Sequence, residues 1–248
     1  MHWQESYDNS GLLVGDANAL VDKALLTLDV TEKVIDEAIE NSFHLIISHH
    51  PLIFKGLKNI LVDNTIGRIV TKAIKNDISI AAMHTNLDNS FLGVNRVLAE
   101  KLGLKDLRIL HQNGSEDDVQ IGSGMLGVLE SEMTEKEFLS LVKEKLNVPA
   151  LRHSELLERP IRKVAVCGGS GSFLINDAKH CKADVYLTAD VKYHDFFDAD
   201  NEILIVDAGH FETEQFTKQL FADIILKKNP KFAVQISSVK TNSVHYFV

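Results

Sequence analysis

The sequence has 248 residues, of which 45% are hydrophobic and 25% are charged. These fractions are those of an ordinary soluble globular protein, and the length suits one large domain or two smaller ones. The net charge of −9 argues against a nucleic-acid-binding surface, because neutralising phosphate groups requires clustered lysine and arginine. This charge still allows a small anionic substrate to be held by a local site.

Features that would place the chain in a membrane or outside the cell are missing from the sequence. No apolar run is long enough to span a bilayer, and the N-terminus carries no basic segment followed by an apolar one. The two cysteines, Cys167 and Cys181, are too few for a disulfide scaffold and suit a reducing compartment. We therefore expect a cytoplasmic protein without membrane contact.

Short apolar runs alternate with segments of helical periodicity. This alternation predicts an α/β fold with largely parallel sheets. Residues 1–16 and 111–119 are polar and are expected to be loops. In chain order we expect strand 24–28, helix 29–40, strand 45–47, helix 64–76, strand 78–83, helix 95–102, strand 121–129, helix 134–146, strand 163–167, helix 173–181, strands 184–188 and 202–206, helix 212–227 and strand 232–237.

Two helix starts carry capping signals. Thr31 is the expected N-cap of the first helix, because a hydroxyl there can accept a hydrogen bond from an amide of the first turn. Thr134 and Glu137 have the spacing of a capping box.

The two halves of the chain show the same order of elements. Strands 24–28 and 164–168 are each followed by a helix and a second strand at the same offset, so Ser48 aligns with Thr188. In each half a third strand ends in a histidine with a carboxylate four residues later. This pattern predicts an internal repeat of two similar α/β lobes, residues 1–110 and 161–248, joined by residues 111–160, with the functional site in the cleft between the lobes.

The adjacent histidines His49 and His50 follow an apolar strand and precede Pro51. Within a regular strand their side chains would point to opposite faces, but a chain that leaves the sheet before proline can direct both rings to one site. Histidine is a common metal ligand, so the pair is a candidate for binding two neighbouring ions. The alternative is one hydrogen-bonded core histidine and one exposed histidine.

His210 and Glu214 are four residues apart at an expected helix start, so both side chains can reach one site. Taken alone, the spacing fits a local ion pair better. The repeat places Asp88 in the position of Glu214, although Asp88 alone would be read as a turn residue. Together, the three imidazoles and two carboxylates suit two divalent ions such as Zn, Mn, Fe, Co or Ni, and two such ions can activate water.

A second group of residues is expected to support these ligands. The repeat aligns His84 with His210, and Asp190 with His50. We expect His84, Asp190 and Asp207 to orient ligands. Either His84 or His194 could move protons as a general acid or base, and His194 could instead contact an anionic substrate.

The glycine-rich segment 168–172 lies between a strand and a helix. It lacks both the dinucleotide fingerprint and the P-loop pattern, so a tight turn is the preferred interpretation and anion binding the alternative. Cys167 precedes this segment without a neighbouring feature that would activate its thiol.

Five motifs carry a family resemblance. The sequences YDNSGLLVGD, LIISHHPLIF, MHTNLDNSFLGVN, TADVKYHDFFDA and DAGHFETEQF, in this order, resemble the NIF-three-like family of dinuclear-metal proteins, also called GTP cyclohydrolase I type 2 homologues. The resemblance covers nearly the whole chain and implies two α/β lobes, a toroidal homohexamer and metal sites that face an inner cavity. It assigns the dinuclear site to His49, His50, Asp88, His210 and Glu214.

Two departures from the family pattern accompany this resemblance. The helix that usually precedes the DNSG loop is expected to be missing or cut short here. Residues 111–160 are too few for the extra domain of longer members, so the chain resembles the short form.

These observations predict a metal-dependent hydrolase that acts on a nucleotide-like or other small anionic substrate, with opening of the GTP ring as one candidate reaction. The competing interpretation is a non-enzymatic metal-binding hexamer that stores or delivers ions or serves as an interaction scaffold. A third is an α/β protein whose histidines are structural and bind no metal.

Overall fold

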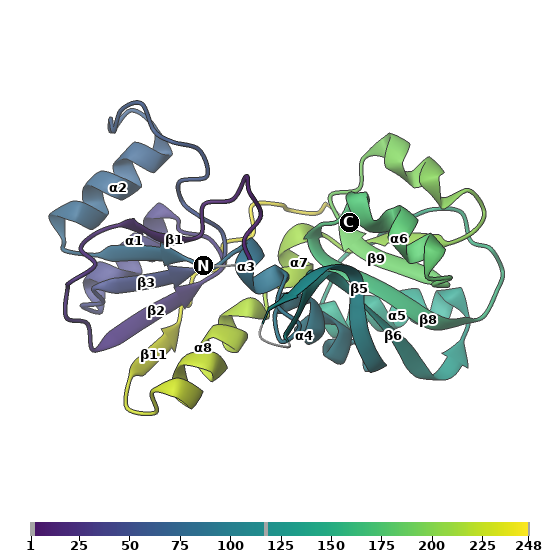
Figure 1. Ribbon diagram of the computed structural model, residues 1–248. Coiled ribbons are helices and arrows are strands. Elements are labelled where there is room, and N and C mark those ends of the chain that lie inside the picture. Colours follow the sequence, from purple (N-terminus) through teal and green to yellow (C-terminus); the bar gives the residue numbers. More distant parts are fainter. Residues whose placement is uncertain (1–2, 117–118, 248) are drawn as a thin grey trace. The chain divides into compact units, whose positions relative to one another are not determined.

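The computed structural model describes residues 3–116 and 119–247. The chain divides into two compact units (Figure 1). The first unit comprises Met1–Leu87 and Thr217–Ser243, and the second comprises Asp88–Phe216 and Val244–Val248. The division into residues 1–110, 111–160 and 161–248 concerns the repeat in the sequence and stays a prediction.

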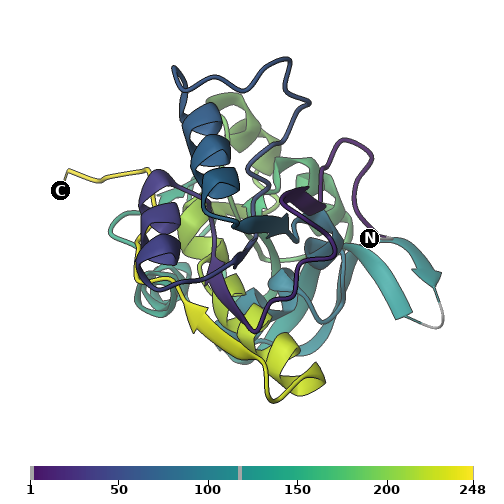
Figure 2. The same ribbon diagram turned by 90° about the vertical axis from the view of Figure 1, so that its left-hand side faces the viewer.

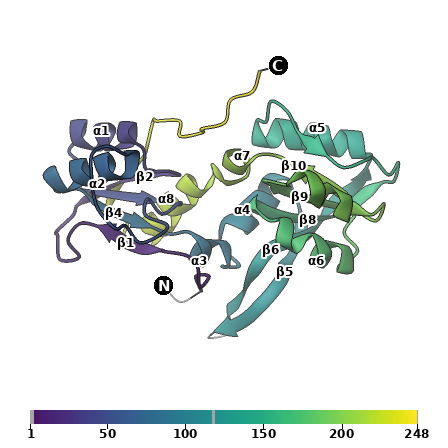
Figure 3. The ribbon, with the colours of Figure 1, turned by 90° about the horizontal axis from the view of Figure 1, so that it is seen from above.

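The first unit is built on a five-stranded sheet with the strand order β1-β4-β3-β2-β11. Its strands are parallel except for β1, which pairs antiparallel with β4. Helices α1 and α2 pack on one face of this sheet and α8 packs on the other (Figure 3). The elements are β1 (Gly11–Val14), β2 (Lys23–Thr27), α1 (Glu32–Glu40), β3 (Leu45–Ser48), α2 (Thr65–Lys75), β4 (Ser79–Ala82), α8 (Thr217–Lys228) and β11 (Ala233–Ile236).

The starts of α1 and α2 follow from local sequence. The Thr31 hydroxyl accepts a hydrogen bond from the Val34 amide, which confirms the predicted N-cap, and Asn64 caps α2 in the same way. Figure 2 shows the two helices side by side. An ion pair between Arg68 and Glu32, 2.9 Å long, joins them, and their apolar faces enter a common core with the sheet.

The second unit contains a six-stranded sheet with the order β5-β6-β8-β9-β10-β7. Helices α4 and α5 contribute to the core on one face, and η1, α6 and η2 contribute to the core on the other. Thr134 and Glu137 form the predicted capping box at the start of α5. The elements are α4 (Val94–Lys101), β5 (Lys105–Glu116), β6 (Val119–Met133), α5 (Glu135–Leu146), β7 (Arg152–His153), β8 (Ile161–Ser170), η1 (Ser172–Leu174), α6 (Ile175–His180), β9 (Val185–Ala189), η2 (Tyr193–Ala199), β10 (Leu204–Asp207) and α7 (His210–Glu214).

Three sequence expectations were wrong. Residues 111–116 belong to β5, which pairs with β6 in an antiparallel hairpin. Their polar composition concealed the strand, because backbone pairing does not require apolar side chains. Residues 11–14 form β1 rather than a loop. The helix expected over 212–227 is two helices, α7 and α8. The chain passes from one unit to the other between them, since α7 belongs to the second unit and α8 to the first.

The two sheets share one connectivity. Each contains three parallel strands consecutive within its sheet, β2-β3-β4 or β8-β9-β10, and the third strand of each set pairs with an antiparallel edge strand. Both units thus have the α/β architecture predicted, and both offer the carboxyl ends of parallel strands as a place for functional residues. Across the described ranges, no helix combines the length and apolar character needed to cross a lipid bilayer.

Candidate metal centre

Histidines and carboxylates of the first unit follow the carboxyl ends of its parallel strands. Asp29 follows β2, His49 and His50 follow β3, and His84 follows β4. Side chains converge at this edge because neighbouring parallel strands end there together. The fold therefore gathers residues that are up to 55 positions apart in the sequence.

His49 and His50 lie together because β3 ends just before them. The Ser48 hydroxyl donates a hydrogen bond of 2.8 Å to the His50 carbonyl oxygen, which helps to turn the chain away from the strand. The His50 amide donates to the Leu28 carbonyl oxygen at 3.0 Å. The ring centroids of the two histidines are 4.9 Å apart.

His84 completes this group, which we call the histidine group. Its ring centroid lies 5.3 Å from that of His49 and 5.5 Å from that of His50. One ring nitrogen from each of the three residues lies within 4.8 Å of the others, so the three could hold a metal ion. His84 was expected to support ligands or move protons, and its position would also allow it to be a ligand.

Hydrogen bonds at Nδ1 orient the rings of His49 and His50. The Nδ1 of His49 lies 2.9 Å from the Met83 carbonyl oxygen, and that of His50 lies 2.7 Å from a carboxylate oxygen of Asp29. These oxygens only accept, so Nδ1 carries the hydrogen and the lone pair of the neutral ring is on Nε2. Histidines that bind metals almost always have this arrangement.

Asp8 orients His84, a role that the sequence did not predict, because Asp8 lies within residues 1–16, which were expected to form a loop. One oxygen of Asp8 lies 2.7 Å from His84 Nδ1, and the other accepts hydrogen bonds from the Thr85 and Ser10 hydroxyls. Burial opposes ionisation of Asp8, but hydrogen bonds from Thr85, His84 and Ser10 outweigh it and lower its pKa to about 2. Burial also lowers the pKa of His84, against the opposing effect of Asp8, which favours a neutral ring.

The second unit presents His210 and Glu214 on the short helix α7, as predicted. His210 Nε2 lies 3.1 Å from a carboxylate oxygen of Glu214, and His210 Nδ1 lies 2.6 Å from a carboxylate oxygen of Asp190. Burial opposes protonation of His210, but hydrogen bonds to Asp190 and Glu214 outweigh it and raise the pKa to about 11. Asp190 follows β9 and His210 follows β10, so these two residues also lie beyond the carboxyl ends of parallel strands.

Asp88 lies close to Glu214. Carboxylate oxygens of the two residues are within 4.8 Å of each other, and the Asp88 carbonyl oxygen accepts a hydrogen bond from the Asn95 side chain. Burial, together with the charges of Asp88 and Glu214, raises the pKa of the Cys167 thiol. Cys167 is also buried among core residues, in surroundings that do not activate a thiol.

The glycine-rich segment makes room for Glu214. A Cβ atom on Gly169 would lie 2.3 Å from a Glu214 carboxylate oxygen, and one on Gly168 would lie 3.3 Å from Glu214 Cγ. Gly169 also has a positive φ of 62°, which favours glycine. The Gly169 amide donates to the Thr213 hydroxyl at 3.0 Å, so this segment supports α7 directly.

Asp207 and His194 differ in their surroundings. Asp207 is buried, pairs with Arg152, and accepts hydrogen bonds from the Val191 and Gly209 amides, which flank Asp190 and His210 in sequence. His194 is exposed on η2, with its ring centroid 5.2 Å from that of Tyr193. The proton-transfer role of His194 stays a prediction.

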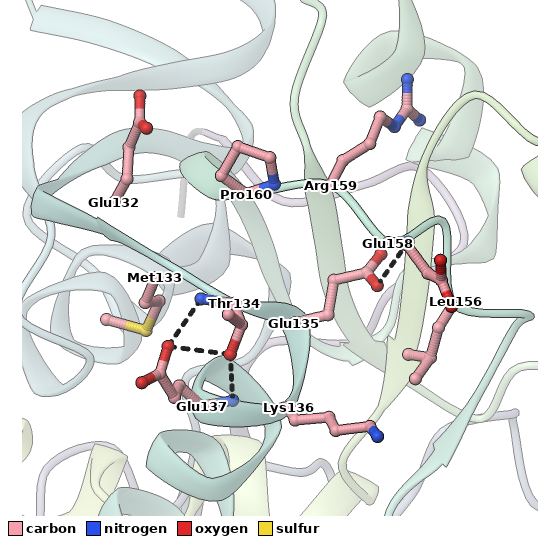
Figure 4. A pocket seen from close by; sticks show the side chains of 10 residues that line it. All are labelled: Glu132, Met133, Thr134, Glu135, Lys136, Glu137, Leu156, Glu158, Arg159 and Pro160. Atoms are coloured by element: carbon pink, nitrogen blue, oxygen red, sulfur yellow. Dashed lines mark hydrogen bonds between the residues drawn. The ribbon is translucent and has the colours of Figure 1, made fainter.

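A pocket of about 600 Å³ in the second unit lies apart from all these residues. Figure 4 shows its lining at the start of α5, which includes four glutamates. Glu137 belongs to the capping box, and Glu135 accepts hydrogen bonds from the Leu157 and Glu158 amides. Two of the four glutamates therefore have a structural role, because their hydrogen bonds stabilise the start of α5 and the segment that contacts it.

Each unit therefore carries its own potential metal ligands. The first supplies imidazoles whose lone pairs lie on Nε2, and the second supplies one imidazole and two carboxylates. Nitrogen and oxygen donors of this kind suit borderline divalent ions. The residues present thus fit a metal, and the ligand set expected from the sequence stays a prediction.

Comparisons with known proteins agree over nearly the full chain. Residues 1–243 match the family model described as Duf34/NIF3 (NGG1p interacting factor 3). A Clostridium perfringens protein named GTP cyclohydrolase 1 type 2 homolog is 40% identical over 85% of this chain and 80% of its own length. A Campylobacter jejuni protein of the same name is 38% identical over 98% of this chain and 92% of its own, so that relative has a similar length.

A solved structure shows the same fold. The Bacillus cereus protein related to NIF3 superimposes with a TM-score of 0.90 at 29% sequence identity, covering 99% of this chain and 95% of that one. The family match and the fold therefore agree with the resemblance read from the sequence. The chain belongs to the Duf34/NIF3 family.

Proposed function

We propose that the chain is a metal-dependent hydrolase with a dinuclear site, in which two histidines of the first unit and one histidine and two carboxylates of the second bind two divalent ions. One observation carries this proposal. His49, His50, His84 and His210 each direct Nδ1 at an oxygen acceptor, the arrangement found in histidines that ligate metal.

The proposed ligands are His49, His50, Asp88, His210 and Glu214. Two divalent ions in such a site lower the pKa of water and polarise the bond that is attacked.

The remaining polar residues hold the ligands in place or handle protons. Asp29 and Asp190 fix the rings of His50 and His210. His84, whose pKa is lowered by burial, can accept a proton at Nε2 while Asp8 holds its Nδ1 hydrogen.

The proposed substrate is a nucleotide-like or other small anionic molecule. The name of the relatives, GTP cyclohydrolase 1 type 2 homolog, supports hydrolytic opening of the GTP ring as the first reaction to test. We further propose that the chain acts in the cytoplasm as a homohexamer, in keeping with the family resemblance.

Elemental analysis combined with activity assays tests this proposal. We expect two transition-metal ions per chain, and turnover of GTP or of one member of a phosphoester panel that Glu214→Ala abolishes. Glu144→Ala, which removes an exposed glutamate from α5, is the matched control and should leave both unchanged. Less than one ion per chain would refute the site, and full metal occupancy without turnover would favour the storage or scaffold alternative.

A further inference from the structure

Two aromatic side chains lie beside the histidine group. The Phe54 ring lies edge-on to His84 with centroids 6.1 Å apart, and the Tyr7 ring lies 6.3 Å from that of Phe54. Tyr7 is 61% exposed and Phe54 is 42% exposed. Aromatic side chains usually gain stability by burial, so an exposed pair next to potential metal ligands suggests a contact with another molecule.

The protein holds these rings in place through the same loops that build the histidine group. The Asn9 side chain donates a hydrogen bond of 2.6 Å to the Ile53 carbonyl oxygen, which joins the loop of Tyr7 to the segment of Phe54. Asp8, next to Tyr7 in the chain, is hydrogen-bonded to His84. The aromatic pair and the imidazole of His84 are therefore positioned by one network.

Positive charge lies close to Phe54 in the sequence. Lys55 and Lys58 are exposed within residues 51–64, although the chain as a whole has a net charge of −9. Exposed aromatic faces bind planar rings by stacking, and lysine ammonium groups attract phosphate. A ligand that matches both features has a planar ring and an anionic group.

We propose that Tyr7 and Phe54 form a stacking subsite for the planar base of a nucleotide, with Lys55 and Lys58 drawing its phosphates toward the same loop. This subsite rests on the proposed function in that it places the base beside the reacting groups. Its occupancy is measurable without turnover, so it can fail or succeed separately from the reaction.

Isothermal titration calorimetry on the full-length protein as purified tests the subsite, with GTP and inorganic triphosphate as probes. Stacking on one aromatic side chain should make Phe54→Ala bind GTP about 10-fold more weakly or worse, with Tyr7→Ala changed in the same direction. Inorganic triphosphate has no ring, so its affinity should not change. Phe54→Trp should retain GTP binding, whereas Phe54→Leu, which keeps apolar volume, should lose it.

Phe173→Ala is the matched control, because Phe173 is 65% exposed in the second unit outside this pair, and it should bind both probes as wild type does. Circular dichroism and metal content identify variants that fold normally. Unchanged GTP affinity in folded Phe54→Leu and Tyr7→Ala, or GTP bound no more tightly than triphosphate, would overturn the subsite. Loss of metal or turnover with intact ring-dependent binding would overturn only the proposed function.

Discussion

The two units carry potential metal ligands of different character. The histidine group of the first unit is made of imidazoles held by Asp8, Asp29 and a backbone carbonyl group, with burial lowering the pKa of His84. In the second unit, by contrast, carboxylates raise the pKa of His210 to about 11. Similar strand topology has thus produced one group of imidazole nitrogens and one group in which carboxylate oxygens surround a single imidazole.

The scaffolds of the two units also differ. The second is formed almost entirely by one continuous stretch, Asp88–Phe216, whereas the first needs Thr217–Ser243 to return from the far end of the chain. Glu37 on α1 joins these distant parts, because its carboxylate accepts hydrogen bonds from Ser237 and Ser238. The first unit therefore depends more on long-range contacts.

Removing one proposed ligand from each unit should have the largest effect. We expect His50→Ala and Glu214→Ala each to weaken metal binding by more than about 100-fold, since replacing a supporting partner of a ligand already costs roughly 10–100-fold. Competition with a chromophoric chelator would measure the affinities. If only one of the two variants lost metal, the units would bind ions separately and the proposal of a shared site would be wrong.

A smaller loss of metal affinity is expected from a substitution at Gly169. Gly169→Ala would force Glu214 to move, because the new Cβ atom would lie 2.3 Å from its carboxylate oxygen. Gly103→Ala is the matched control, since Gly103 also has a positive φ, 77°, but no heavy atom within 4 Å of the added methyl group. Both variants should lose about 1 kcal/mol from backbone strain. Only Gly169→Ala should also bind metal more weakly, and equal metal binding by both would exclude a supporting role for Gly169.

The carboxylates that hold the histidine group allow a third comparison. We expect Asp29→Asn to reduce metal affinity about 10–100-fold, because Asp29 orients the proposed ligand His50. Asp8→Asn acts on His84, which is not a proposed ligand, and should change metal affinity less. Their effects on folding should differ, because the Asp8 side chain is fully buried whereas that of Asp29 is 36% exposed. Urea unfolding should show a loss of about 2–3 kcal/mol for Asp8→Asn and less than about 1 kcal/mol for Asp29→Asn. Equal losses would mean that the Asp8 hydrogen bonds contribute little to folding.

Most of the architecture could be read from the sequence because it is encoded locally. The caps at Thr31 and Thr134 and the spacing of His210 and Glu214 depend on residues within one helical turn. The polar strand of residues 111–116 could not be read, since its pairing with β6 depends on backbone hydrogen bonds rather than on side-chain pattern.

The contact between Asp8 and His84 was harder to predict than the caps and the helical spacing. Asp8 is separated from His84 by 76 residues and sits in a sequence typical of a turn, so its role appears only when β4 brings the two together. A general signal was available, because each histidine ligand needs an acceptor for its second nitrogen. This rule does not identify which carboxylate in the sequence supplies the acceptor.

The smallest predicted effect is on the stability of the first unit, where Glu37 joins the C-terminal segment to α1. Burial opposes ionisation of Glu37, but hydrogen bonds from Ser237 and Ser238 outweigh it and lower the pKa of Glu37 below its ordinary value of 4.5. A carboxylate with a depressed pKa stabilises the fold above its unfolded-state pKa, and this contribution is lost as the pH falls through the folded-state pKa. Glu37→Gln should therefore be about 1 kcal/mol less stable than wild type at pH 7, with the difference shrinking below about pH 4.5.

Thermal unfolding of Glu37→Gln and wild type across this pH range would measure the difference. Glu40→Gln, an exposed change at the end of the same helix, is the control and should show no such pH dependence. If the gap between Glu37→Gln and wild type stayed constant down to pH 3, the ionised carboxylate would not be what joins the C-terminal segment to α1. The first unit would then be closed by the packing of β11 against β2, and its stability would rest on the same kind of contact as that of the second.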